Sequence, residues 1–371
     1  MEEKKYSPFT IASVYIGTVV GAGFASGQEV LQFFGYFGIR GFVGIALSSA
    51  VFIFFGILIL QLGYKLKAES FLPVVKEVAG EKIGFVIDMI ITFFMLGVVV
   101  TMAAGAGAIF VEQFNLPAIL GSLFMVGISL VTVVLGINKV IESIRFVAPI
   151  LVISILGLAL WTIFSDPQTL ARNLSVNETA RAAVPFWPLA ALLYSSYNLV
   201  LAIPVLAPLG ALSQPKALRS GAIWGGLGLG ICAVAISASI LTRAPEATRF
   251  EVPMIAIAGS LSPAIRTLYS LVLVAEVYTT SVAGLYGFAS RLAKEGTAAY
   301  RWLAVGTAVI GLLLARVGFS NLVSFLFPVE GFAGFLLLGA LAYCYSKSCA
   351  FPEASIAPSP ALRPEEEQNE K

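Results

Sequence analysis

A run of glycines and small polar residues interrupts the first long apolar stretch of the chain. It reads GTVVGAGFASGQE from Gly17 to Glu29, and each of its four glycines weakens a helix by roughly 1 kcal/mol relative to alanine. A helix that breaks here leaves free carbonyls at the end of its first half and free N–H groups at the start of its second. The carbonyls suit a hard cation and the N–H groups suit a carboxylate. The predicted solute-binding residues of this break are Gly21, Ala22, Gly23, Phe24, Ala25 and Ser26, and the predicted cation-binding carbonyls are those of Val19 and Ala22.

A second polar group lies in the sixth apolar stretch, which is too long for one plain span. Two prolines, Pro204 and Pro208, follow the polar group, so we expect two half-helices joined by an unwound segment. Its hydroxyls and amide would form the wall opposite the first break. The predicted solute-binding residues here are Tyr194, Ser195, Ser196, Tyr197 and Asn198.

A third group lies in the eighth stretch and could bind a cation. Glu276, Thr279 and Thr280 have the i, i+3, i+4 spacing that places side chains on one helix face. With Ser281, they could form an all-oxygen site of the kind that hard cations prefer. The alternative is that the hydroxyls bond carbonyls of their own helix.

Four of the acidic residues in the apolar stretches have an expected role or position. An acid inside a membrane is costly and seldom idle, so Glu276 is a candidate for proton coupling or a partner of polar groups in the bundle. Glu330, two residues after Pro328, belongs either to a gate or to a packed kink. Glu29 is expected at the outer end of the first span, and Asp88 is expected near Lys82.

The elements that must position these groups are membrane-spanning helices. Hydrophobic residues make up 58% of the chain and charged residues only 12%, with a mean hydropathy of +0.92; soluble domains carry roughly a quarter charged residues. We therefore predict an all-α membrane protein with one transmembrane domain over residues 1–346 and a disordered cytoplasmic tail over 352–371. The ten predicted spans are 8–36, 39–64, 84–112, 117–136, 144–165, 183–211, 219–242, 264–291, 299–318 and 320–346.

Ten spans divide into two halves of five, about 8–165 and 183–346. Five is odd, so the second half would cross the membrane in the opposite sense to the first. The two interrupted spans are then the first and sixth, and interruptions at matching positions of two inverted halves point to a transporter's binding site. For either interruption alone, close helix packing or a simple kink is the plainer explanation.

The distribution of lysine predicts the orientation in the inner (plasma) membrane of the cell. Every lysine before the tail falls in segments on the side of the N-terminus, and the opposite segments carry only arginines. By the positive-inside rule, both termini are cytoplasmic.

Composition also excludes several function classes. Net charge is +2, which does not indicate nucleic-acid binding, and nothing in the chain indicates an oligomeric state or an organic cofactor. Histidine is absent, which removes Ser-His catalysis. The only aspartates are Asp88 and Asp166, and Asp166 falls in a loop, so an intramembrane aspartyl protease is also excluded and we expect no enzyme.

The run from Gly21 to Glu29 resembles the opening helix of the YkvI-type bacterial membrane proteins, which in turn resemble distant members of the amino acid–polyamine–organocation superfamily. The resemblance covers residues 6–346. It implies the LeuT-like fold, with five-plus-five inverted repeats, discontinuous helices 1 and 6, and coupled transport of a small solute. In the wider superfamily a Gly-x-Gly break exposes amides to a substrate carboxylate, and Gly21 and Gly23 match it.

The resemblance also suggests a coupling ion. Sodium-dependent superfamily members carry a Thr/Ser pair in the eighth helix, which Thr280 and Ser281 match, with Thr279 as an alternate. Some proton-coupled relatives carry a lysine in the fifth helix, and the segment 146–165 has none, which favours sodium. The expectation is therefore a sodium-coupled symporter of a small carboxylate-bearing solute such as an amino acid. The alternatives are proton coupling through Glu276 and a solute sensor that does not transport.

Overall fold

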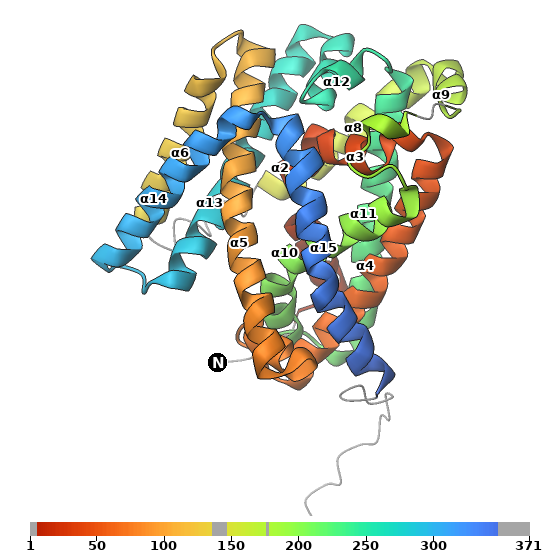
Figure 1. The fold of residues 1–371 in the computed structure, drawn as a ribbon. Coiled ribbons are helices and arrows are strands. Elements are labelled where there is room, and N and C mark those ends of the chain that lie inside the picture. Colours follow the sequence, from red (N-terminus) through yellow and green to blue (C-terminus); the bar gives the residue numbers. More distant parts are fainter. Residues whose placement is uncertain (1–5, 136–146, 176–177, 348–371) are drawn as a thin grey trace, which may run out of the picture.

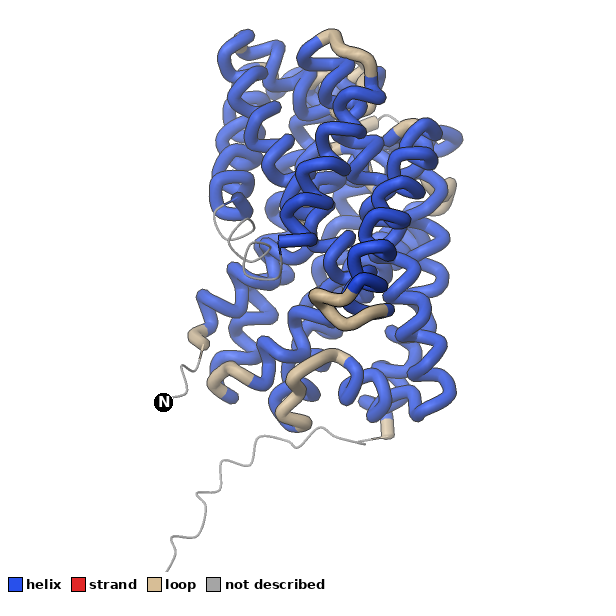
Figure 2. Tube along the Cα trace, turned by 90° about the vertical axis from the view of Figure 1, so that its left-hand side faces the viewer, coloured by secondary structure: helices blue, strands red, loops and turns tan. Residues whose placement is uncertain are grey.

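The computed structural model describes residues 6–135, 147–175 and 178–347, and this part of the chain consists of helices joined by short loops, with no β-strand beyond an isolated bridge between Tyr6 and Ser213. Most of the helices run along the same long direction of the molecule, which is clearest in Figure 2. The expectation of an all-α membrane protein is therefore confirmed, while the predicted tail over 352–371 lies outside the described residues.

Helices occupy the positions where the apolar stretches predicted spans. Within the described residues, eight of them are long and apolar enough to cross a membrane, and the bent pair α8–α9, which turns by 91°, would add a ninth. The first stretch contributes only a shorter apolar helix, α1. The long helices are α4 (Ile39–Lys65), α5 (Leu72–Phe114), α6 (Ala118–Leu135), α8 (Val147–Ser165), α10 (Trp187–Ala211), α11 (Pro215–Thr242), α13 (Pro263–Leu292), α14 (Ala298–Leu314) and α15 (Phe319–Ser346).

Short helices connect these spans. α9 (Pro167–Asn173) begins at Asp166, whose side chain accepts a hydrogen bond from the Thr169 N–H and caps it. α12 (Pro253–Leu261) lies between α11 and α13. The remaining elements are the 3-10 turns η1 (Gly35–Phe37), η2 (Thr179–Arg181), η3 (Ala247–Arg249) and η4 (Ala315–Val317).

The first apolar stretch forms three helices rather than one. α1 (Pro8–Val19) ends before Val20 and Gly21, and α2 (Ala22–Ser26) follows. α3 (Gln28–Phe33) begins after Gly27, which has φ of +82°. Only glycine adopts this left-handed conformation at little cost, so Gly27 turns the chain and sets the direction in which α3 leaves α2.

The prediction that the sixth stretch contains an unwound segment is wrong. α10 runs without a break from Trp187 to Ala211, with both prolines inside it. Each proline removes one backbone hydrogen bond, but prolines are tolerated in membrane helices where neighbours and polar side chains compensate. The Ser195 hydroxyl and the Asn198 amide each bond the carbonyl four residues back, so the polar residues bond to the helix instead of opening it.

The helices pack as two groups. α1, α4, α10 and α11 contact one another, and so do α5, α6, α13 and α14; Figure 1 shows the second group together at the left. The α1–α11 and α4–α10 contacts correspond to each other when the two halves of the chain are exchanged, as do α5–α6 and α13–α14. The site described below lies at α2 and α3, because α2 contacts α5 and α13 of the second group and α3 contacts α10 and α11 of the first.

Candidate functional site

The break between α1 and α2 leaves backbone groups of both kinds without partners. Among the described residues, no backbone hydrogen bond is donated by the N–H groups of Ala22, Gly23 and Phe24. At the end of α1, the Val19 carbonyl accepts a bond from the Gly21 N–H (2.8 Å), while the Val20 carbonyl accepts none from the described residues. The backbone therefore offers donors at the start of α2 and an acceptor beside the end of α1, as expected for a broken helix.

Thr280 of α13 faces this break. A Cβ atom placed on Gly21 would lie 3.6 Å from Thr280 Oγ1. The hydroxyl therefore lies beside the backbone of the break, with no side chain between them. The Thr280 side chain also hydrogen-bonds the carboxyl group of Glu276, one turn earlier on α13. Glu276 is buried, and its Oε2 atom has no partner among the described residues. We call Gly21, Glu276 and Thr280 the α13 locus.

The neighbouring hydroxyls of α13 point elsewhere. Thr279 Oγ1 donates to the Glu276 carbonyl (3.0 Å) of its own helix. Ser281 Oγ accepts a bond from Ser129 Oγ of α6 (3.0 Å). Of the three predicted ion ligands on this helix, Thr280 is therefore the one that the structure places at the break.

Glu29 lies in the core beside α2 and not at the membrane surface. Its carboxylate lies against Gly23: a Cβ atom on that glycine would be 1.8 Å from Glu29 Oε1. The other oxygen, Oε2, accepts a hydrogen bond of 2.5 Å from the Tyr197 hydroxyl of α10. The expectation that Glu29 is interfacial is thus wrong, because the turn at Gly27 directs α3 back into the bundle, where Glu29 is 6% exposed.

Glu330 of α15 is a second carboxylate near Glu29. It is 1% exposed, and neither of its oxygens has a hydrogen-bond partner among the described residues. Its Oε1 occupies the space beside Gly97 of α5, where a Cβ atom would be 2.5 Å away. Glu29 is close enough to interact with it electrostatically.

Aromatic rings pack around Tyr197, the partner of Glu29. The Tyr197 ring lies 4.9 Å from the Phe327 ring of α15 and 5.8 Å from the Phe33 ring of α3, measured between centroids. Phe327 and Glu330 are three residues apart on α15 and so share a face of that helix. The Tyr194 ring also packs on Phe33, and its hydroxyl has no partner among the described residues.

The other predicted polar residues bond to backbone. Ser26 Oγ donates to the Gly23 carbonyl (2.7 Å), and Ser196 Oγ donates to the Gly331 carbonyl of α15 (2.8 Å). With the bonds of Ser195 and Asn198 within α10, these polar groups are already satisfied. Of the five predicted residues of the sixth stretch, Tyr194 and Tyr197 are the ones whose rings contact α3.

The charges buried in the described part of the molecule are all acidic. Glu29, Glu276, Glu330 and Asp88 are buried, whereas no described lysine or arginine is. Asp88 pairs with Arg291 of α13 and not with Lys82 as expected, because α5 packs along α13 and brings the arginine to it. The three glutamates have no such partner, and unpaired buried charges are very costly. A proton or a bound cation at any of these three positions would therefore lower that cost.

Two contacts at the site carry no clear sequence signal. Tyr269 of α13 donates a hydrogen bond of 2.7 Å to the Ala25 carbonyl and so holds α2. Phe327 contributes the ring that stacks on Tyr197. Both are aromatic residues in apolar helices, where most aromatic side chains only pack. Only the fold distinguishes Tyr269 and Phe327 from the other aromatic residues of these helices.

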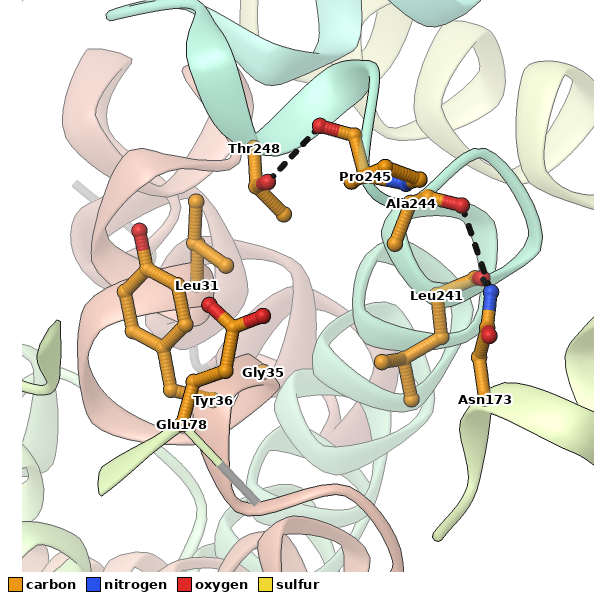
Figure 3. Close-up of a pocket in the computed structure, with 9 residues that line it drawn as sticks. All are labelled: Leu31, Gly35, Tyr36, Asn173, Glu178, Leu241, Ala244, Pro245 and Thr248. Carbon is orange, nitrogen blue, oxygen red and sulfur yellow. Dashed lines mark hydrogen bonds between the residues drawn. The ribbon is translucent and has the colours of Figure 1, made fainter. Parts of the chain in front are cut away.

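One described pocket lies apart from this site. It is a surface pocket of about 430 Å³, part of it open to solvent, and Figure 3 shows Tyr36 and Glu178 on one side and Asn173 and Leu241 on the other. None of the predicted site residues lines it. Glu178 pairs with Arg181 at 2.9 Å, Arg181 lies over the Tyr36 ring, and the Asn173 amide donates to the Leu241 carbonyl (2.8 Å), so these polar groups already have partners.

Comparison with known proteins places this arrangement in a family. No protein-family model matches the chain. The chain is 31% identical over 345 residues to the "uncharacterized membrane protein YkvI" of Bacillus subtilis (strain 168), covering 92% of this chain and 97% of the relative. It is 26% identical over 336 residues to "uncharacterized protein YyaD" of the same organism, covering 88% and 93% respectively.

Solved structures share the fold at low identity. One is MhsT in complex with L-phenylalanine, with a TM-score of 0.66 and 15% identity, covering 97% of this chain and 94% of that one. A Na+-coupled sialic acid symporter gives 0.61 and 10%, covering 91% and 79%. Mhp1, a nucleobase-cation-symport-1 family transporter, gives 0.53 and 13%, covering 94% and 77%. The chain belongs to the YkvI family of membrane proteins, and its helices adopt the LeuT-like fold.

Proposed function

We propose that the protein is a secondary active transporter that couples the movement of a small solute to that of a cation, with sodium as the coupling ion. The observation that carries the proposal is the α13 locus. There, a hydroxyl and a buried carboxylate lie beside unpaired backbone at a break in a helix. Irregular backbone is tolerated at membrane depth only where it is buried or lines a cavity.

The ligand atoms of this locus suit sodium. Thr280 Oγ1, the Glu276 carboxylate and the Val20 carbonyl are all oxygens, which are the ligands of hard cations. Thr280 takes the main role, and Thr279 and Ser281 support the helix through their own bonds. Coupling to protons at Glu276 is the alternative. Proton binding would use the same buried carboxylate and would not require the Thr280 hydroxyl.

The solute in this proposal carries a carboxylate. The three N–H groups of Ala22, Gly23 and Phe24 have no described acceptor and could receive it. Tyr194 and Tyr197 of α10 would form the facing wall. An amino acid meets the requirement, and the fold relative MhsT is described with L-phenylalanine bound.

Transport requires the site to be reached from each side in turn. The group of α1, α4, α10 and α11 would rock against that of α5, α6, α13 and α14, as in transporters built from inverted repeats. The contacts that correspond between the two halves support such a repeat, over about 8–165 and 183–346. The proposal keeps ten spans, and the distribution of lysine supports both termini in the cytoplasm. Glu330, between α15 and α5, would then respond to the movement as a gating residue.

Thermal unfolding of the purified protein in sodium against choline tests the ion assignment. A ligand that binds the folded state raises stability by mass action. We expect sodium to raise the apparent melting temperature and one amino acid of a panel to raise it further. A response to pH in place of sodium would assign coupling to Glu276, and no response to either would contradict the proposal.

A solute sensor on the same fold is the second candidate. It would bind solute at the same residues without moving it. Solute counterflow in proteoliposomes separates the two, because a transporter exchanges labelled for unlabelled solute across the bilayer and a sensor does not.

A further inference from the structure

The carboxyl groups of Glu29 and Glu330 are neighbours in the core, but their hydrogen bonding differs. α3, which carries Glu29, packs on α15, which carries Glu330, and the two groups interact electrostatically. Glu29 accepts the 2.5 Å bond from the Tyr197 hydroxyl. Glu330 is 1% exposed, and neither of its oxygens has a hydrogen-bond partner among the described residues. We call Glu29 and Glu330 the carboxyl pair.

The described chain provides no positively charged partner for the carboxyl pair. The elements packed against α3 and α15 are α2, α4, α5, α10, α11, η1 and η4, and every lysine and arginine on them is exposed. Of the acids on α5, Asp88 pairs with Arg291, Glu112 accepts bonds from two backbone N–H groups, and the others are exposed. The other buried titratable side chains on α15 and these elements are phenols and thiols, which are uncharged at neutral pH: Tyr36, Tyr194, Tyr197, Cys232 and Cys344.

The carboxyl pair is packed too closely for a cation that needs several ligands. A Cβ atom on Gly23 would lie 1.8 Å from Glu29 Oε1, and one on Gly97 would lie 2.5 Å from Glu330 Oε1. Neither acid lines either of the two described pockets. No three His, Cys, Asp or Glu side chains of the described residues lie close enough to hold a metal ion. A proton binds to a carboxyl oxygen without requiring additional space.

Hydrogen bonding indicates which of the two acids takes the proton. A hydrogen bond to the ionised form favours ionisation, whereas burial and a neighbouring negative charge oppose it. Glu29 accepts the bond from Tyr197, but Glu330 accepts none. The geometry therefore favours negative charge on Glu29 and a proton on Glu330.

Glu330 also lies where the two groups of helices meet. The Ser196 hydroxyl of α10 donates to the carbonyl of Gly331, the next residue of α15, and so joins α15 to the first group. The carboxyl oxygen Oε1 of Glu330 lies against Gly97 of α5, which belongs to the second group. Rocking of one group against the other would therefore separate the carboxyl group from Gly97 and expose it to water, where it can ionise.

We propose that Glu330 is a proton-binding residue, which holds a proton while it lies against Gly97 and releases it when α15 moves away from α5. This inference rests on the proposed function for that movement. It adds a proton, bound outside the α13 locus, to the solute and the cation of the transport cycle.

Infrared spectroscopy of the purified full chain tests whether the proton is present. A protonated carboxyl group has a C=O stretching band that a carboxylate lacks, and the band shifts in D2O. At neutral pH, we expect Glu330→Gln to lose the intensity of one protonated carboxyl group. Glu81→Gln, which removes an exposed carboxylate of α5, is the matched control and should keep the wild-type intensity. An unchanged band in Glu330→Gln would overturn the inference.

A second variant covers the case in which Glu330→Gln does not fold. Glu29→Gln removes the negative charge beside Glu330 and leaves the proton-binding carboxyl group in place. Without that charge, Glu330 should lose its proton more readily, so the pH at which its band disappears should fall by about one unit. A band that disappears at the wild-type pH would also overturn the inference.

Release of the proton is tested in proteoliposomes that contain a pH indicator in weak buffer, with the membrane potential clamped by potassium and valinomycin. Sodium-driven uptake of a labelled mixture of neutral amino acids should change the luminal pH with the wild type and not with Glu330→Gln. Accumulation without a pH change in the wild type, or a pH change that persists in Glu330→Gln, would overturn the inference.

Failure of the proposed function would be seen separately. A protein that takes up no solute, and in which Glu330→Gln still removes one protonated carboxyl group, would retain the proton site and indicate a sensor. Sodium-driven uptake without that protonated group would leave transport standing and remove the proton from the cycle.

Discussion

Gly23→Ala tests whether the contact between Glu29 and Gly23 holds the core together. The new Cβ atom would lie 1.8 Å from Glu29 Oε1, 2.7 Å from Cδ and 3.1 Å from Cγ. An ordinary carbon–oxygen contact is longer than 3 Å, so the carboxylate must move by more than about 1 Å to relieve the overlap. That movement breaks the 2.5 Å bond from the Tyr197 hydroxyl.

The expected loss of stability follows from two opposing effects. A buried hydrogen bond to a charged group contributes about 1.5–3 kcal/mol. Alanine in place of glycine in a helix raises the free energy of unfolding by about 1 kcal/mol. The free energy of unfolding should therefore fall by about 0.5–2 kcal/mol. Gly21→Ala is the matched control, because its Cβ atom meets Thr280 only at ordinary contact distances of 3.6 and 3.8 Å.

A double-mutant cycle measures whether Gly23 acts through the bond to Tyr197. The unfolding free energies of Gly23→Ala, Tyr197→Phe and the double variant are compared in a detergent-mediated unfolding titration. If both changes remove the same bond, their effects should fall short of additivity by about 1 kcal/mol or more. Effects that add within about 0.5 kcal/mol, the usual margin for independent sites, would refute the reasoning, as would a Gly23→Ala protein as stable as the wild type.

Two other contacts lead to predictions about single side chains. Thr280→Ala should raise the sodium concentration that gives half-maximal stabilisation by about tenfold. Ser281→Ala, which loses only its bond with Ser129 of α6, should leave that concentration unchanged. Equal sodium titrations of the two variants would argue against the α13 locus. Asp88→Asn should lower the free energy of unfolding by about 2–3 kcal/mol because it leaves Arg291 without its partner. Lys82→Ala, at an exposed side chain, should change it by less than about 0.5 kcal/mol. Chemical or detergent unfolding of both variants measures the two losses, and a larger loss for Lys82→Ala would contradict the Asp88–Arg291 pairing.

The spans were predictable because membrane solvation makes hydropathy and charge decisive. Helix boundaries such as Ile39–Lys65 and Pro263–Leu292 lie close to the predicted ones, since lysines, arginines and turn residues mark where apolar stretches end. The glycines before Phe24 also indicated where the first stretch would stop being one helix. In both cases the signal is local, and local signals can be interpreted from a single sequence.

What the sequence could not predict depends on contacts between distant residues. Ser195 and Asn198 look like the residues of an unwound segment, yet they bond carbonyls of their own helix and α10 stays intact. Glu29 becomes a core residue only because Gly27 takes a left-handed conformation and turns α3 inward. Whether Thr280 or Ser281 faces the break depends on a rotation of α13 of about 100° per residue, which hydropathy does not determine.

Sodium-driven uptake tests the central claim most directly. The purified protein is reconstituted into liposomes, and uptake of the labelled amino acid that stabilises it best is followed with and without an inward sodium gradient. The account predicts accumulation above the external concentration, and loss of that accumulation when the gradient is dissipated. At the wild-type half-saturating sodium concentration, Thr280→Ala should reduce uptake about fivefold, because a sodium site about tenfold weaker is mostly empty there. Binding of the same amino acid without accumulation or exchange, under sodium or proton gradients, would contradict it.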